Sequence, residues 1–155
     1  VLTVEIWRDS ITDFNNGTSG SWIKGPAGYQ GVVTGGVFQN LTYAHSGHSG
    51  VLFSQSFRLL SGRTYSFSYR ARNISPQPQD VAPSFSVRTS LGQAILPTFN
   101  VPRNSQWYTQ SNNFSVAKTD SYILQIVSHQ DRGGGNNGDG GNDYQMDDFI
   151  LRLIK

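Results

Sequence analysis

Cysteine is absent from the 155 residues, and this absence excludes disulfide bonds and metal sites with thiolate ligands. No run of apolar residues approaches the roughly 20 that a membrane-spanning helix needs, so we expect no membrane insertion. The chain also lacks a GxSxG nucleophile elbow and a glycine-rich phosphate loop ending in Lys-Ser or Lys-Thr. These absences argue against several common enzyme classes.

Charged residues are few, and among them Arg far outnumbers Lys and Asp far outnumbers Glu. Nine of the 12 basic residues are Arg, and Glu5 is the only Glu among the ten acidic residues. Because Lys and Glu usually cover exposed helix faces, their scarcity disfavours helix, whereas the many Gly, Ser, Thr, Asn, Val and aromatic residues favour strands and turns. The net charge of +2 is too small to indicate nucleic-acid binding.

Apolar residues recur with a period of two along most of the chain, and no segment as long as about 11 residues keeps the helical period. Clusters of Gly, Pro, Ser and Asn separate these stretches and mark turns. The pattern predicts an all-β fold, a two-sheet antiparallel jelly-roll sandwich, as a single domain over residues 1–155. The expected strands are 2–7, 31–38, 51–59, 63–73, 83–90, 94–99, 107–116, 121–129 and 144–154.

The expected strand 63–73 carries two arginines on the face opposite its aromatic residues. Tyr65 and Phe67 alternate with serines, and the alternation continues to Arg70 and Arg72. Because neighbouring side chains of a strand point to opposite faces, the aromatic set is expected between two sheets and the arginines on an outer face.

Strands 83–90 and 121–129 show similar alternation. If they share a sheet with 63–73, one outer face collects Arg70, Arg72, Arg88, Gln125 and His129. The guanidinium group of arginine presents paired N–H donors that bind carboxylates and vicinal hydroxyl groups, so this face is a candidate recognition surface. The alternative is that the charges only protect an exposed sheet from aggregation.

Aromatic residues near loops are further candidates for sugar contacts. Core packing is the favoured interpretation for Trp22 and Trp107, and sugar stacking is the alternative. Tyr43 could line a site at the loop mouth. Trp107 and Tyr43 therefore join the candidate ligand contacts.

Three polar motifs, the two histidines, the glycine-rich stretch and the Asp pair, are not expected to form catalytic or zinc sites. His45 and His48 are expected to be exposed turn residues, because no third zinc ligand is evident. The glycine-rich stretch 132–143 is expected to be a flexible loop, with a ligand or second calcium loop through Asp139 or Asp143 as the alternative. The pair at 147–148 is not expected to be catalytic, because neighbouring strand residues point to opposite faces.

Four segments in order resemble the β-sandwich carbohydrate-binding modules of the galactose-binding-like, jelly-roll fold. They are the opening phrase ITDFNNGTSGSW at 11–22, the Ser-Gly turn AHSGHSGVLFS at 44–54, the hairpin FRLLSGRTYSFSYRARN at 57–73 and the closing strand DYQMDDFILRLI at 143–154. Together they span almost the whole chain. The fold alone does not name a ligand, because it serves many functions.

The resemblance implies a structural calcium ion that ties the first and last strands together. Its ligands would be Asn15, backbone carbonyl groups around Ser46 and His48, and Asp147. Calcium takes six to eight oxygen ligands, which this set helps to supply. The family more often has an acid where Asn15 stands, and a neutral ligand weakens the site.

The expected function is therefore a non-catalytic, extracellular, lectin-like module that binds a glycan. Arginines suit an acidic glycan. We expect a bacterial secreted or cell-surface protein in which the module is an adhesin tip or an accessory domain of a larger chain. A protein-binding adhesion domain and a structural spacer on the same scaffold are the alternatives.

Overall fold

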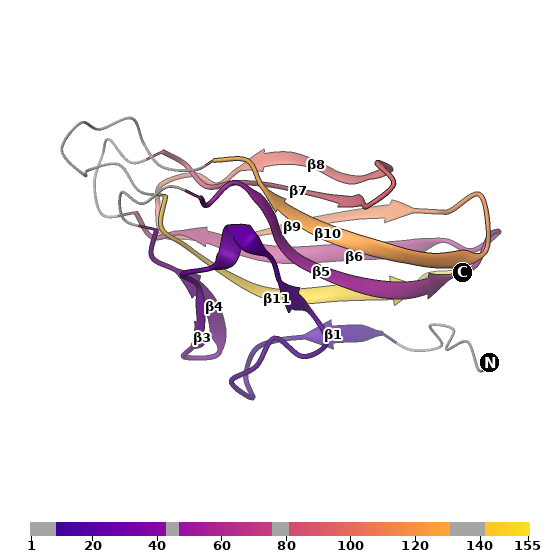
Figure 1. Cartoon of the computed structure of the whole chain (residues 1–155), viewed down its shortest axis with the longest axis horizontal. Helices are drawn as coiled ribbons and strands as arrows, with labels where there is room; N and C mark the ends of the chain where they lie inside the picture. The colour runs from indigo at the N-terminus through magenta and orange to yellow at the C-terminus, as the bar shows by residue number, and fades with distance from the viewer. Residues whose placement is uncertain (1–8, 43–46, 76–80, 131–141) are drawn as a thin grey trace.

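The computed structural model describes residues 9–42, 47–75, 81–130 and 142–155. In these ranges the chain forms two antiparallel sheets that face each other (Figure 1). The five-stranded sheet has the order β2 (Ile23–Lys24), β5 (Gly50–Leu59), β10 (Asp120–Ser128), β7 (Ser84–Thr89) and β8 (Ala94–Asn100). The six-stranded sheet has the order β3 (Val32–Thr34), β4 (Val37–Asn40), β11 (Tyr144–Leu153), β6 (Tyr65–Asn73) and β9 (Trp107–Phe114), with β1 (Ser10–Thr12) paired to β11.

The predicted two-sheet antiparallel sandwich is confirmed. The helical element in the described ranges is a three-residue 3-10 turn, η1 (Pro26–Gly28). None of the helical structure there is long and apolar enough to cross a membrane.

Most predicted strands agree with the structure, and the differences occur near the N-terminus. The predicted strand 31–38 is a hairpin of β3 and β4, because Gly35 and Gly36 take positive φ angles of 58° and 78° and reverse the chain. Sequence patterns missed β1 and β2 because these strands have three and two residues and lie among turn signals. The predicted strand 2–7 lies outside the described residues.

Aromatic side chains fill the space between the sheets. Along β6, buried residues alternate with half-buried ones from end to end, so the predicted inward set is confirmed. Trp22 packs edge-on against Phe57 and Phe149, with ring centroids 5.8 and 5.4 Å apart, and its predicted core packing is confirmed. Each buried side chain of this size contributes about 1.5–3 kcal/mol.

The chain crosses repeatedly between the sheets, and these crossings correct one expectation. β6 lies in the six-stranded sheet, whereas β7 and β10 lie in the five-stranded sheet, so their outward residues do not share a face. β5 and β6 flank a turn at Gly62 but enter different sheets, so they are not a paired hairpin. Alternation along one strand shows which residues face outward, but it does not show which sheet the strand joins.

Candidate functional site

One row of side chains crosses the outer face of the six-stranded sheet. The strand register places Trp107 opposite Arg72, Arg72 opposite Gln145, Gln145 opposite Gln39, and Gln39 opposite Val32. Directly opposed residues of antiparallel strands share a face. This cross-strand row runs over β9, β6, β11, β4 and β3, and adjacent strands are about 4.8 Å apart.

The members of the cross-strand row hold one another in place. The guanidinium carbon atoms of Arg70 and Arg72 lie 4.9 and 5.2 Å from the centroid of the Trp107 ring, within cation–π range. Arg72 Nη2 donates to Gln145 Oε1 at 2.7 Å, and Gln145 Nε2 donates to Gln39 Oε1 at 2.8 Å. Val32 is exposed, whereas these five linked side chains, Arg70 included, are half-buried and so remain within reach of a ligand.

The cross-strand row leads into a hollow at the edge of the sheet. This end hollow has a volume of about 320 Å³ and is lined by Gln30, Val32, Gln39 and Leu41. The buried Gln30 Oε1 accepts no hydrogen bond from the described residues. A ligand lying along the row would therefore meet the exposed Val32 side chain at this end.

No protein-family model matches the chain, and no curated protein sequence matches it significantly. Among solved structures, the C-terminal domain of EclA, described as a sugar-binding protein, is 22% identical, with a TM-score of 0.57 over 91% of this chain and 96% of that one. The chain has the two-sheet fold of carbohydrate-binding modules.

Two further structures support the same fold. The CBM22-1 xylan-binding domain of Xyn10C from Paenibacillus barcinonensis is 16% identical, with a TM-score of 0.57 over 94% of each chain. A module of carbohydrate-binding family CBM4 is 14% identical, with a TM-score of 0.56 over 85% of this chain and 86% of that one. The resemblance predicted from the four sequence segments is confirmed at the level of fold.

A bulge in β11 brings two carboxylates beside Arg70. Asp147 lies opposite Arg70 in the register, which shifts between Asp147 and Ile150, and Asp148 takes a positive φ of 53°. Asp148 Oδ2 accepts from Arg70 Nη1 at 3.3 Å, and the Asp148 backbone N–H donates to Asp147 Oδ1 at 2.8 Å. The expectation that the side chains of residues 147 and 148 point to strictly opposite faces is therefore wrong, because the bulge interrupts the alternation within β11.

The environment of Asp147 favours its protonated form. Partial burial raises the pKa of the Asp147 carboxyl above its usual range, and the nearby negative charges of Asp148 and Asp13 raise it further. The Asp148 N–H and the Arg70 guanidinium lower the pKa and offset part of this effect.

Arg72 differs from the neighbouring arginines in its partners. Arg70 pairs with Asp148 at 3.3 Å, and Arg152 pairs with Asp9 at 2.9 Å. Arg72 forms no ion pair with any described carboxylate, and its buried Nε donates to no described acceptor. Its positive charge is thus balanced by no carboxylate in the part of the chain that the structure describes.

The other predicted ligand contacts lie on the opposite side of the sandwich. On the outer face of the five-stranded sheet, Arg88 Nε donates to Gln125 Oε1 at 3.1 Å, and His129 Nε2 shares a hydrogen bond of 2.6 Å with Ser86 Oγ. These are two separate exposed pairs. Tyr43 lies outside the described residues.

The prediction that His48 is an exposed turn residue is wrong. His48 is fully buried and stacks on Tyr29, with ring centroids 4.9 Å apart and planes 16° apart. It lies just before β5 and packs against the Tyr29 ring from the segment after η1, whereas the neighbouring Gly47 and Ser49 are exposed. His45 lies outside the described residues.

The predicted calcium ligands are only partly described. Asn15 donates its backbone N–H to Asp13 Oδ1 at 3.1 Å, and Asp13 lies close enough to Asp147 to affect its pKa. Ser46 lies outside the described residues. Within the described ranges, no group of three or more His, Asp or Glu side chains could hold a metal ion, and calcium binding stays a prediction.

Asp143, the last residue of the glycine-rich stretch, is a buried carboxylate. Its Oδ1 accepts from the Thr42 backbone N–H at 2.7 Å and from the Thr42 hydroxyl at 3.2 Å. The side chain thus links the start of β11 to the segment after β4. Asp139 lies outside the described residues.

Sequence interpretation named Arg72 and Trp107 as candidate ligand contacts but missed Gln145 and Gln39 and favoured the wrong position for Trp107. The expectation that Trp107 packs in the core is wrong, because the inward positions of β9 are those of Tyr108 and Phe114, and Trp107 is half-buried on the outer face. Alternation within β9 could have shown this. Gln145 and Gln39 had no comparable signal, because their importance comes from the register that aligns them with Arg72.

Proposed function

We propose that this chain is a non-catalytic glycan-binding module and that the cross-strand row is its binding surface. Two of the solved structures that share its fold are described as a sugar-binding protein and a xylan-binding domain. The observation that carries the proposal is the linkage of Trp107, Arg72, Gln145 and Gln39 before any ligand arrives. Because these side chains are already ordered, binding loses less conformational entropy.

The cross-strand row keeps hydrogen-bonding capacity for sugar hydroxyl groups. A glutamine amide has two N–H donors and one carbonyl acceptor. Gln145 uses one donor, and the Gln39 amide nitrogen donates to no described acceptor. Sugar hydroxyl groups both donate and accept, so these amides suit them, while the exposed part of the Trp107 indole suits the C–H groups of a sugar ring.

The charge of Arg72 favours an acidic glycan. Its guanidinium lies beside neutral partners, the Trp107 ring and the Gln145 amide. A uronate carboxylate or a sulfate group would supply the missing negative charge and accept charge-assisted hydrogen bonds. Arg70 is less available, because Asp148 already neutralises it.

A glycan array that includes acidic and neutral polysaccharides tests this proposal. The Arg72→Ala variant should bind acidic glycans much more weakly than the wild type does, without a fall in melting temperature. Arg88→Ala on the five-stranded sheet is the matched control and should bind like the wild type. Equal loss in both variants, or none in Arg72→Ala, would remove the row from the binding surface.

We place the module outside the cell, on a bacterial secreted or surface protein, as an adhesin tip or accessory domain. The bacterial origin of one xylan-binding fold neighbour supports this placement. A protein-binding adhesion domain would keep its host-protein affinity after deglycosylation. A structural spacer would bind nothing on the array.

Calcium binding near Asp147 is part of the proposal. The Asp13 and Asp147 carboxylates and the Asn15 amide are oxygen donors of the kind that calcium prefers. A chelator should then lower the melting temperature of the wild type and have little effect on Asp147→Ala. Identical melting curves with and without chelator would exclude a stabilising calcium ion.

A further inference from the structure

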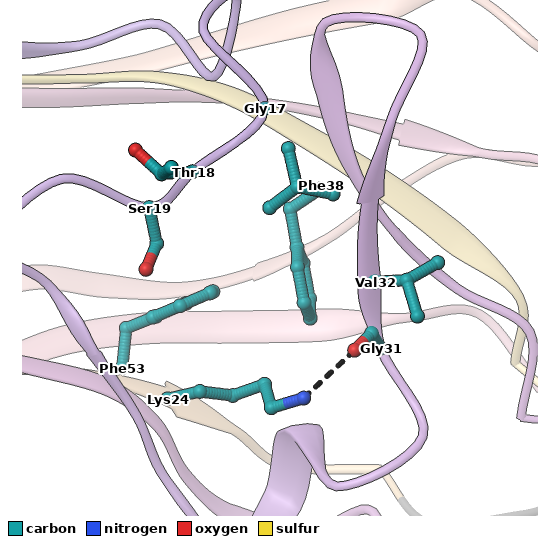
Figure 2. A pocket seen from close by; sticks show the side chains of 9 residues that line it. Gly17, Thr18, Ser19, Lys24, Gly31, Val32, Phe38 and Phe53 are labelled. Atoms are coloured by element: carbon teal, nitrogen blue, oxygen red, sulfur yellow. Dashed lines mark hydrogen bonds between the residues drawn. The ribbon is translucent and has the colours of Figure 1, made fainter.

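A second concave region lies beside the β3 end of the cross-strand row, between the loop after β1 and the β3–β4 hairpin. This edge pocket has a volume of about 410 Å³, within the range of small-ligand pockets. Figure 2 shows Thr18 and Ser19 on one side, with Phe38 facing them across the pocket and with Phe53 and Lys24 in the lower part of the view.

The rim of the edge pocket presents donors and acceptors together. Lys24 Nζ donates to the Gly31 carbonyl at 2.8 Å, as the dashed line in Figure 2 marks. An ammonium group has three N–H donors, so two remain for a ligand. The Thr18 and Ser19 hydroxyls donate to Asn16 Oδ1 at 3.0 Å and to the Trp22 carbonyl at 2.9 Å, so their oxygens can still accept from a ligand.

The base of the edge pocket is apolar and well ordered. Phe38 and Phe53 are each 1% exposed and pack edge to face, with ring centroids 4.8 Å apart. The Phe38 ring can lie directly against the backbone of residue 31 only because that residue is glycine, since a Cβ there would lie 2.0 Å from Phe38 Cζ. The pocket therefore combines an aromatic base with a polar rim whose charged group is the Lys24 ammonium.

We propose that the edge pocket is a second carbohydrate site, which takes a single uronic acid ring. The C–H groups of the ring would lie against the apolar lining above Phe38 and Phe53, which includes the exposed Val32 side chain. Its hydroxyl groups would donate to Thr18 and Ser19, and its carboxylate would accept from Lys24. Lys24 forms no ion pair with any described carboxylate, so the ligand would supply its counter-charge. This site does not depend on the cross-strand row, and the two regions share only Val32 in their linings.

Nuclear magnetic resonance titration of the full chain with sodium D-galacturonate tests the proposal. Methyl galactoside is the control that has the sugar ring without the charge, and sodium acetate is the control that has the carboxylate without the ring. Galacturonate should shift the amide signals of Gly17–Ser19 and Gly31–Val33, and it should bind at least about tenfold more tightly than either comparison compound. Equal affinity for acetate would mean an anion site only, and equal affinity for methyl galactoside would remove the role of the charge; either result overturns the proposal.

Variants separate this site from the proposed row. Lys24→Gln keeps much of the side chain but removes the charge, and it should weaken galacturonate binding about tenfold with no change in melting temperature. Lys118→Gln, an exposed lysine in the turn before β10, is the matched control. Arg72→Ala should leave galacturonate binding at the pocket intact, so failure of one proposal is distinguishable from failure of the other. Unchanged binding in Lys24→Gln would overturn the edge-pocket proposal.

Discussion

The outer faces of the two sheets carry similar residue types in different arrangements. On the six-stranded sheet, Arg72, Gln145 and Gln39 form a continuous chain that ends on the Trp107 ring. On the five-stranded sheet, Arg88 and Gln125 form an isolated exposed pair. Composition alone would rate the two faces alike. The difference is preorganisation, because a linked and half-buried row loses less freedom on binding than separate exposed side chains.

The largest expected difference between the faces comes from the tryptophan. Trp107→Ala removes the ring that supports both guanidinium groups, and we expect acidic-glycan affinity to fall by about thirtyfold or more, as at other aromatic hot spots. Ile123→Ala removes an exposed apolar side chain from the other sheet and should leave affinity unchanged. Calorimetric titration measures both variants, and comparable losses would mean that the faces do not differ.

The next effect tests the continuity of the row. Gln145→Leu keeps a similar volume but breaks the hydrogen bonds to Arg72 and Gln39, so affinity should fall about fivefold. Gln125→Leu makes the same change on the five-stranded sheet and should have no effect on binding. If Gln145→Leu binds normally, the linkage contributes nothing and Arg72 acts alone.

A smaller effect concerns stability and pH on the six-stranded sheet. The folded-state pKa of Asp147 is raised, so the folded state binds the proton more tightly than the unfolded state does. Ionisation of Asp147 therefore lowers stability as pH rises through the window above its ordinary value of 3.8. With chelator present, Asp147→Asn should melt at a higher temperature than the wild type at neutral pH, and the difference should shrink in acid. A lower melting temperature for Asp147→Asn at neutral pH would contradict this account.

The smallest expected effect is on the five-stranded face. Arg88→Ala removes an exposed pair with Gln125, and the free energy of unfolding should change by no more than about 0.5 kcal/mol. Chemical denaturation measures this directly. A change of several times that size would show that the exposed pair has a structural role.

The sequence predicted the sandwich because each strand carries its own alternation. Tyr65 and Phe67 could be assigned inward, and Arg70 and Arg72 outward, from β6 alone. The prediction that Arg88, Gln125 and His129 share a face with Arg70 and Arg72 was wrong, because the sheet that a strand joins depends on how the chain crosses between the two layers.

Two local features escaped prediction for the same kind of reason. The Asp147–Asp148 bulge depends on a left-handed residue that is not glycine, so no turn signal marks it. The burial of His48 depends on the ring of Tyr29, which comes from a different segment of the chain. Contacts between distant segments decided both outcomes.

The most direct test of the central claim is an amide chemical-shift map of the whole protein titrated with an oligouronide. The account predicts perturbed signals along Trp107, Arg72, Gln145 and Gln39, including the Trp107 indole N–H, with Arg88, Gln125 and His129 unchanged. Perturbations confined to the five-stranded face would contradict it.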